Sequence, residues 1–297
     1  MAGTAAPTWA PDPALRRQLE RLAIVAARPH GHLHTGGRRS RAVGSSIEFA
    51  DHRRYSTGDD YRHIDWNVYA RSDALFVKVR ESEETLPVHL FLDTSASMGY
   101  GRRTPFDTGR AVLAALGWAT LAAADLLHAA TFGSGLETVF PPTQGRGNAA
   151  RFIEFLDGLG PQGSTRMVEA VRAYVARGHP HGAAIVASDL LTPHATTALG
   201  MLAERGHEVT VLHILAPETL RPDFAEETEL RDVEGGVSIE VYGDGELLDA
   251  YRQTVAAWLD EVRRFCHQRH VRYVPLEAGW PVDDIVLRRL RTHGVIA

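Results

Sequence analysis

The sequence predicts an α/β protein with a doubly wound, mostly parallel sheet. Two observations support this fold class. Short apolar runs at 88–92 and 183–187 end at an aspartate or at Ser-Asp, as strands covered on both faces do. Segments with helical periodicity separate these runs, and strands that alternate with helices build a parallel sheet flanked by helices. With 297 residues and 44% hydrophobic side chains, the chain is long enough for such a core.

The N-terminal part is predicted to be a smaller assembly ahead of the sheet. Residues 1–13 are rich in Ala and Pro, which predicts a loose tail. Leucines at helical spacing predict an amphipathic helix over 14–27, and turn residues between short alternating stretches predict strands, most clearly at 74–80. We therefore expect an appendage of one helix and several strands at 14–83, followed by the sheet domain at 84–297.

The elements of the sheet domain follow from the same patterns. Strands are expected at 88–92, 130–132, 136–140 after a Gly-Ser-Gly turn, 183–187, 208–215 and 271–275. Helices are expected at 106–128, 147–156, 166–176, 194–204, 245–270 and 283–290. A Gly-Gly pair predicts a β-excursion near 228–243.

Composition excludes several classes of function. The net charge of −5, from 32 basic and 37 acidic residues, is not that of a generally cationic protein, so no nucleic-acid partner is expected. The single cysteine, Cys266, excludes a disulfide framework and indicates a reducing compartment. Lys78 is the one lysine and lies in a strand-like stretch, which excludes Schiff-base and Walker-type chemistry. The apolar run at 111–124 is too short to span a bilayer and no signal peptide is visible, so we expect a cytoplasmic protein with no membrane span.

The most informative motif is Asp93-Thr94-Ser95-Ala96-Ser97, directly after the first buried strand. In an open α/β sheet, the carboxyl ends of central strands face the ligand. A carboxylate followed at +2 and +4 by hydroxyls places three oxygens near one point, and oxygen ligands favour a hard cation such as Mg²⁺ or Mn²⁺. Thr165 and Asp189, in later loops at the same expected edge, supply two more oxygens. The alternative interpretation of the motif is a capping cluster for the next helix.

These residues resemble the metal-ion-dependent adhesion site of von Willebrand factor A-like domains, and the order of elements from Val88 onward is similar to theirs. The resemblance implies a von Willebrand A-like, Rossmann-like fold. The upstream segment resembles the bacterial domain-of-unknown-function-58 family (DUF58), in which such a segment precedes a von Willebrand A-like domain. The matching residues are Glu48-Phe49, Arg53 to Tyr55, Gly58-Asp59, Arg62, Ile64-Asp65-Trp66, Ala70-Arg71 and Glu81.

The resemblance implies a ligand set and a setting. Hydroxyl ligands would be Ser95, Ser97 and Thr165, with Asp93 and Asp189 holding the ion directly or through water. Arg166 and Leu190 depart from the family pattern, which often has an acidic residue and a glycine there, and neither change removes a ligand. Family members are similar to partners of MoxR-type AAA+ ATPases, which implies an adaptor in protein remodelling or maturation.

The charge of the ligand set favours binding over catalysis. Three neutral hydroxyls and two carboxylates leave a divalent ion incompletely neutralised, so an acidic side chain of a protein partner is expected to complete the site. We therefore expect a non-enzymatic, metal-dependent protein-interaction module.

Three alternatives are weaker but stay open. The first is a magnesium-dependent phosphohydrolase with Asp93 as nucleophile, which is disfavoured by Ser95 at +2 and by the missing lysine. The second is a transition-metal site at the imidazoles of the 30–34 run. The third is an anion or single-strand surface formed by the arginines between 38 and 71. Nearby acidic residues can pair with most of these arginines, which favours an ion-paired brace or a docking surface instead. Trp66, Trp118 and Trp258 are expected to be core or domain-contact residues rather than ligand platforms.

Overall fold

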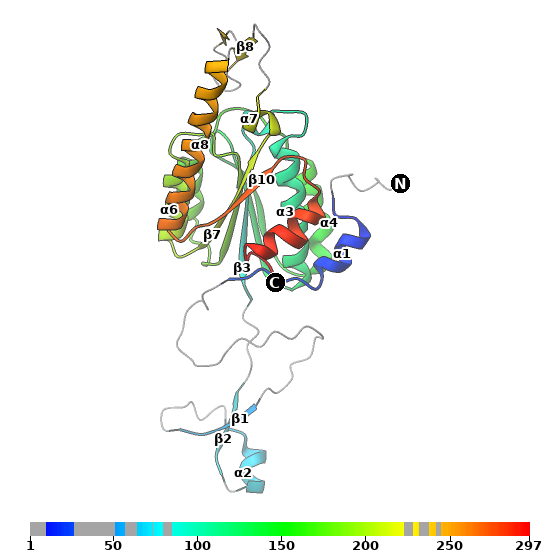
Figure 1. Ribbon diagram of the computed structural model, residues 1–297. Coiled ribbons are helices and arrows are strands. Elements are labelled where there is room, and N and C mark those ends of the chain that lie inside the picture. Colours follow the sequence, from blue (N-terminus) through cyan, green and yellow to red (C-terminus); the bar gives the residue numbers. More distant parts are fainter. Residues whose placement is uncertain are drawn as a thin grey trace. The chain divides into compact units, whose positions relative to one another are not determined.

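The computed structural model describes residues 10–26, 51–56, 64–72, 74–79, 85–222, 228–231, 238–241 and 245–297. The chain divides into two compact units, residues 1–32 with 86–297 and residues 33–85. The larger unit contains the main sheet, and the smaller one contains a two-stranded sheet and a helix (Figure 1). The run at 30–34, and most of the arginines between 38 and 71, lie outside the described residues.

The larger unit is built on a six-stranded sheet with the order β10-β7-β6-β3-β4-β5. All neighbouring strands are parallel except β4 and β5, which form the expected antiparallel hairpin. The strands are β3 (Pro87–Asp93), β4 (Leu126–Phe132), β5 (Leu136–Thr143), β6 (Ala183–Ser188), β7 (Glu208–Leu215) and β10 (Arg272–Glu277). The prediction of a doubly wound, mostly parallel α/β sheet is confirmed.

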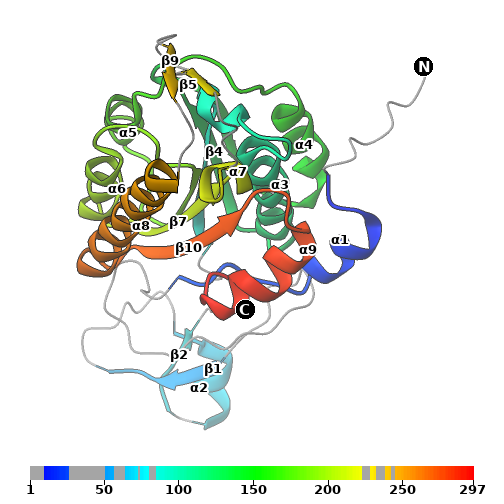
Figure 2. The ribbon, with the colours of Figure 1, turned by 45° about the horizontal axis from the view of Figure 1, so that its top comes forward.

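Helices cover both faces of this sheet (Figure 2). One face carries α1 (Pro13–Leu19), α3 (Pro105–Ala122), α4 (Ala149–Asp157) and a C-terminal helical segment made of α9 (Val282–Asp284) and residues Ile285–Leu290. The other face carries α5 (Met167–Val175), α6 (Ala195–Glu204) and α8 (Gly245–Gln268). Shorter pieces are two 3₁₀ turns (Ala96–Gly99 and Arg146–Asn148), α7 (Pro217–Leu220) and the antiparallel pair β8 (Thr228–Arg231) and β9 (Ser238–Val241). No helix in the described ranges combines the length and apolarity needed to cross a membrane.

Helix α3 shows where local periodicity misplaces a boundary. Its start is set by Thr104, whose side chain accepts a hydrogen bond from the backbone N of Asp107, and by Pro105 in the first turn. The helix was expected to reach residue 128, but it ends at Ala122, and Ala124 adopts a left-handed φ of 58°. The apolar residues that follow belong to β4, where they pair with β3. An apolar run that ends a helix and starts a buried strand has no periodicity to divide it.

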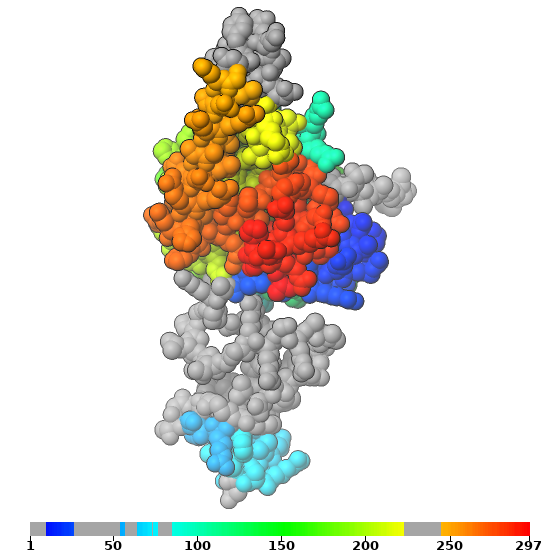
Figure 3. All heavy atoms as spheres, in the orientation of Figure 1, coloured from blue at the N-terminus to red at the C-terminus, as the bar shows by residue number. Residues whose placement is uncertain are grey.

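Helix α1 is also shorter than expected. It ends at Leu19 rather than near residue 27 because the chain then pairs with the C-terminus. The backbone N of Val25 donates to the carbonyl of Val295 at 2.9 Å, and the backbone N of Ala297 donates to Ala23 at 3.0 Å. Figure 3 shows the two ends of the unit side by side, blue against red. Leu19 is buried in the core of the larger unit, whereas the sequence pattern assigned this helix to the appendage.

The smaller unit contains β1 (Asp51–Arg54), β2 (Phe76–Val79) and α2 (Trp66–Ser72). The two strands are antiparallel, which agrees with the strand expected at 74–80. Helix α2 was not expected; Asp65 begins it by accepting a hydrogen bond from the backbone N of Asn67 at 2.9 Å. Trp66 is 61% exposed, so it is not a core residue of this unit.

Candidate metal site

The site lies where the direction of strand addition reverses. From β3 the chain passes through α3 to β4 on one side, and from β6 it passes through α6 to β7 on the other. β3 and β6 are parallel neighbours, with Leu92 opposite Ala187, so the residues that follow them emerge together at the carboxyl edge. This switch point is where open α/β sheets bind their ligands.

Asp93 is the last residue of β3 and is fully buried. Its Oδ1 accepts a 2.9 Å hydrogen bond from the backbone N of Ser95, and its Oδ2 accepts a 2.6 Å hydrogen bond from the Ser188 hydroxyl. These bonds hold the carboxylate from its own turn and from the neighbouring strand. The orientation of Asp93 is therefore set by two elements.

Ser95 and Ser97 lie together in the turn that follows. Their hydroxyl oxygens are 3.0 Å apart, and both residues are buried. Ser97 belongs to the 3₁₀ turn Ala96–Gly99, whose backbone brings the second hydroxyl back toward the first. Thus the structure brings together the three oxygen donors expected from this motif.

Asp189 directly follows β6 and is buried. Its Oδ1 accepts a 3.0 Å hydrogen bond from the backbone N of Leu191, and Leu190 between them has a left-handed φ of 55°. His213 on β7 lies 2.9 Å from the Asp189 carbonyl oxygen through Nε2. Because a carbonyl only accepts, Nε2 carries the proton, and Nδ1 accepts from the Tyr273 hydroxyl at 2.8 Å. The neighbouring strand therefore fixes the main chain at Asp189.

The loop that carries Thr165 is bonded to both of these turns. The backbone N of Gln162 donates to the Thr94 carbonyl at 2.7 Å, and the backbone N of Ala96 donates to the Gly163 carbonyl at 2.9 Å. On the other side, the Thr192 hydroxyl donates to the Thr165 carbonyl at 3.2 Å. The three loops that carry the five expected ligands therefore meet at one edge of the sheet.

The two aspartates repel each other. Burial, and then the charge of Asp189, raise the pKa of Asp93 to about 7, while the hydrogen bonds from Ser188 and Ser95 lower it. Burying two carboxylates close together is costly, because each disfavours the charged form of the other. The pair is therefore a place where a cation would be stabilising.

The donor set fits Mg²⁺ or Mn²⁺ chemically. All five expected ligands are oxygens, which hard divalent cations prefer over nitrogen and sulfur. In the described part of the chain, no three His, Cys, Asp or Glu side chains converge on one point. The two aspartates would therefore need the hydroxyls of the neighbouring loops as further ligands.

Two further groups at this edge were missed by the sequence patterns. Ser188 bonds to Asp93, and its hydroxyl also accepts from the backbone N of Leu190 at 2.9 Å. Glu137 on β5 accepts from the Thr94 hydroxyl at 3.0 Å. The sequence did offer a signal for Ser188: it ends a buried strand and directly precedes the expected ligand Asp189. The sequence contains no such signal for Glu137, because a residue of the β4–β5 hairpin comes close to Thr94 only through the order of the strands in the sheet.

Other expectations can be compared with the structure. Cys266 is buried on α8, and burial raises the pKa of its thiol to about 11, which is typical of a structural cysteine and not of a nucleophile. Trp118 and Trp258 are partly buried and pack against the two cores. The residue at +2 from Asp93 is Ser95, bonded to Ser97, where a phosphohydrolase of the type considered above has a second aspartate.

Comparison with known proteins decides the family. The family model described as "Protein of unknown function DUF58" matches residues 51–258. The chain belongs to the DUF58 family. The match covers part of the smaller unit and most of the sheet of this DUF58 protein, including the site residues.

Curated relatives of this DUF58 protein are uncharacterised. It is 28% identical to the uncharacterized protein Rv1480 of Mycobacterium tuberculosis over 298 residues, covering 96% of this chain and 92% of that protein. The uncharacterized protein Mb1516 of Mycobacterium bovis matches with the same identity, 28%, and the same coverage.

Solved structures with similarity to the DUF58 chain include the conserved hypothetical protein BatB from Bacteroides thetaiotaomicron. The TM-score is 0.45 at 17% identity, covering 70% of this chain and 98% of BatB. The VWA domain of SpRpn10 gives a TM-score of 0.34 at 15% identity, covering 44% and 75%. Similarity at this level carries no conclusion about a ligand or a partner.

Proposed function

We propose that this DUF58 protein is a metal-dependent protein-interaction module, with the ion held by Asp93, Ser95, Ser97, Thr165 and Asp189. The observation that supports this most directly is the pair of buried carboxylates, Asp93 and Asp189, at one sheet edge. The paired hydroxyls of Ser95 and Ser97 lie in the turn that follows Asp93. Two like charges are buried together in proteins where a cation or a proton compensates them.

The chain's residues would contribute in two ways. Asp93 and Asp189 supply the negative charge, and the serine and threonine hydroxyls supply oxygen without charge. When bound, Mg²⁺ or Mn²⁺ would neutralise the carboxylates and keep a positive attachment point for an oxygen ligand from outside. A Glu or Asp side chain of a protein partner is the ligand that this charge balance favours.

The setting we propose is an adaptor that works with a MoxR-type AAA+ ATPase in remodelling or maturing another protein. It rests on the resemblance of the DUF58 sequence pattern to partners of such ATPases, and the metal site itself does not depend on it. A MoxR-type ATPase from the same organism, purified and tested for binding with and without the metal, is the direct test of this part.

The metal is tested by calorimetric titration of the full chain with Mn²⁺. We expect saturable binding that is lost in Asp93→Asn, because this change removes a ligand charge and keeps the shape of the side chain. Asp249→Asn is the matched control: Asp249 is an exposed aspartate on α8, outside the site. Equal Mn²⁺ binding by the wild type and Asp93→Asn would contradict the site.

The interaction is tested by capture of partners with and without chelator. We expect the wild-type chain to lose its partners when the metal is removed and Asp93→Asn to lack them throughout. If the same partners bind without the metal, the ion has no part in the interaction. The enzymatic alternative predicts magnesium-dependent release of phosphate from an aryl phosphate, and we expect none.

A further inference from the structure

We propose that a second site, at the opposite edge of the sheet, binds a small phosphate-type anion between His181, Arg205 and His207. A pocket of about 260 Å³ lies there, lined by Tyr174, Val175, Gly178, His179, Pro180, His181, Arg205 and His207. Its walls are the turn before β6 and the turn before β7, so it lies at the amino ends of these strands. Asp93 and Asp189 lie at the carboxyl ends, and the two sites are independent.

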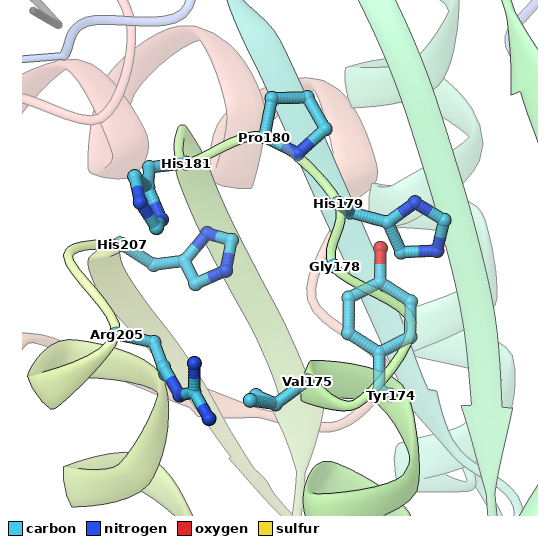
Figure 4. A pocket seen from close by; sticks show the side chains of 8 residues that line it. All are labelled: Tyr174, Val175, Gly178, His179, Pro180, His181, Arg205 and His207. Atoms are coloured by element: carbon cyan, nitrogen blue, oxygen red, sulfur yellow. The ribbon is translucent and has the colours of Figure 1, made fainter.

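The lining is basic and carries no carboxylate. Three of the eight residues are histidines and one is an arginine. Figure 4 shows His181, His207 and Arg205 along one side of the pocket, with Gly178, Tyr174 and His179 along the other. Glu204, just before the turn, is bound to Arg269 by a hydrogen bond of 2.9 Å and so does not neutralise this side.

Arg205 is available for a ligand. Its side chain is exposed and forms no ion pair with any residue in the described ranges. A guanidinium presents several N–H donors in one plane, which suits the oxygens of a phosphate. Arg205 follows the last turn of α6 and is positioned by a backbone hydrogen bond to Met201.

The histidines form a continuous group behind the pocket. The His89 and His128 rings stack at 4.5 Å on neighbouring strands, His128 and His179 lie 4.8 Å apart, and His89 and His207 lie 4.6 Å apart. His89 Nε2 donates to the Pro180 carbonyl at 3.0 Å, because a carbonyl only accepts. His89 Nδ1 therefore accepts from the Tyr174 hydroxyl at 2.7 Å.

Some buried imidazole nitrogens of this group make no hydrogen bond with any residue that the structure describes. Among them are Nε2 of His128 and Nε2 of His179. Buried polar atoms in proteins are generally hydrogen-bonded, so a polar ligand or water is expected close to this group. An apolar ligand would not satisfy these atoms.

The geometry favours an anion with several oxygens over a metal ion. No three His, Cys, Asp or Glu side chains in the described ranges converge on one point, as a zinc-type site with imidazole ligands requires. The imidazoles and the guanidinium instead line different sides of the pocket. A phosphate group offers several acceptor oxygens spread over such a volume, and either inorganic phosphate or the phosphate of a small metabolite has this chemistry.

The test is calorimetric titration of the full chain with inorganic phosphate and, separately, with glycerol phosphate. We expect saturable binding of at least one, with affinity about tenfold weaker in Arg205→Gln, because one charged hydrogen-bonding group is removed. His181→Asn, an exposed position, should weaken binding in the same direction. Arg252→Gln on α8 is the matched control, since Arg252 is exposed and lies outside the pocket.

The outcomes separate the two sources of phosphate. Tighter binding of inorganic phosphate would identify the free ion, and tighter binding of glycerol phosphate would identify a phosphorylated small molecule. Binding of neither, equal binding by Arg205→Gln and wild type, or binding of Zn²⁺ without either phosphate would overturn the proposal.

Discussion

The Ser188 hydroxyl donates a 2.6 Å hydrogen bond to Asp93 Oδ2 and joins the ends of β6 and β3. The same hydroxyl accepts from the backbone N of Leu190, so it also orders the turn that carries Asp189. One side chain thus links both aspartates of the candidate site. Ligands held in this way owe their orientation to residues that never touch the ion.

Replacing Ser188 is therefore expected to affect both stability and metal binding. Ser188→Ala leaves a buried carboxylate oxygen and a backbone N–H each without a partner, which costs about 1 to 3 kcal/mol of unfolding free energy. We expect Mn²⁺ affinity to fall by about tenfold or more, because the turn is less well ordered. Urea denaturation and calorimetry measure the two effects. Ser72→Ala, at an exposed serine of α2, is the control. An unchanged affinity in Ser188→Ala would contradict the positioning role.

Asp189→Asn should separate charge from shape at the site. In chelator, the variant is expected to be at least as stable as wild type, by up to about 1 kcal/mol, because the repulsion with Asp93 is gone. Wild type should gain about 2.7 kcal/mol when free Mn²⁺ is about 100 times its Kd, and the variant should gain much less. Denaturation curves with and without Mn²⁺ measure both. A variant stabilised by Mn²⁺ as much as wild type would show that Asp189 is not a ligand.

Much of this site follows from strand ends alone. A buried strand that ends at Asp93, and another that ends just before Asp189, predict two carboxylates at one edge, because parallel strands share their direction. The alternating pattern of elements predicts the sheet for the same reason. Contacts between residues that are distant in sequence cannot be predicted in this way. The bond from Ser188 to Asp93 and the pairing of Val25 with Val295 depend on register and chain ends, which local patterns do not contain.

The histidine group illustrates a second limit. His128 was assigned to the end of a helix, although it lies in β4 opposite His89. Each histidine taken alone is unremarkable in sequence. The group exists because β3 lies between β6 and β4 in the sheet. This order brings His89 on β3 next to His128 on β4 and next to the turns that carry His179 and His207. Trp66, expected to be a core or domain-contact residue, begins a short helix and is exposed, so it is not part of the core.

The buried histidines predict loss of stability in acid. Burial lowers the pKa of His89 to about 2, and those of His128 and His213 to about 4, from 6.5. At these histidines the folded state binds fewer protons than the unfolded state below pH 6.5, so their contribution to stability is complete above that pH and is lost as the pH drops toward 4. Each histidine contributes up to about 1.4 kcal/mol per pH unit.

His128→Phe isolates one of these contributions. A phenyl ring keeps the stacking on His89 and cannot titrate, and His128 Nε2 has no hydrogen-bond partner among the described residues to lose. The slope of unfolding free energy against pH between 4 and 6.5 should fall by up to about 1.4 kcal/mol per unit. His267→Gln, at an exposed position on α8, serves as the control. A slope that is the same in His128→Phe and wild type would mean that His128 already titrates normally in the folded state.

At Leu190, beside the metal site, we expect substitution by glycine to destabilise the protein less than substitution by alanine. Its φ of 55° is left-handed, which costs a residue with a Cβ about 1 to 2 kcal/mol, yet its side chain is buried. Both Leu190→Ala and Leu190→Gly lose the buried side chain and should destabilise the protein by about 2 to 5 kcal/mol before the backbone is considered. Glycine adopts this φ freely, so Leu190→Gly should be more stable than Leu190→Ala by about 1 kcal/mol, although alanine is the more stabilising residue where φ is negative.

The comparison also tests how the turn supports Asp189. If the left-handed backbone at Leu190 is what lets the Leu191 N–H reach Asp189 Oδ1, Leu190→Gly should keep Mn²⁺ affinity closer to wild type than Leu190→Ala does. Urea denaturation gives the order of stability, and calorimetry gives the order of affinity. If alanine proves the more stable of the two, the turn relaxes to an ordinary φ when the leucine side chain is removed, and the position of Asp189 then depends on Ser188 and His213 alone.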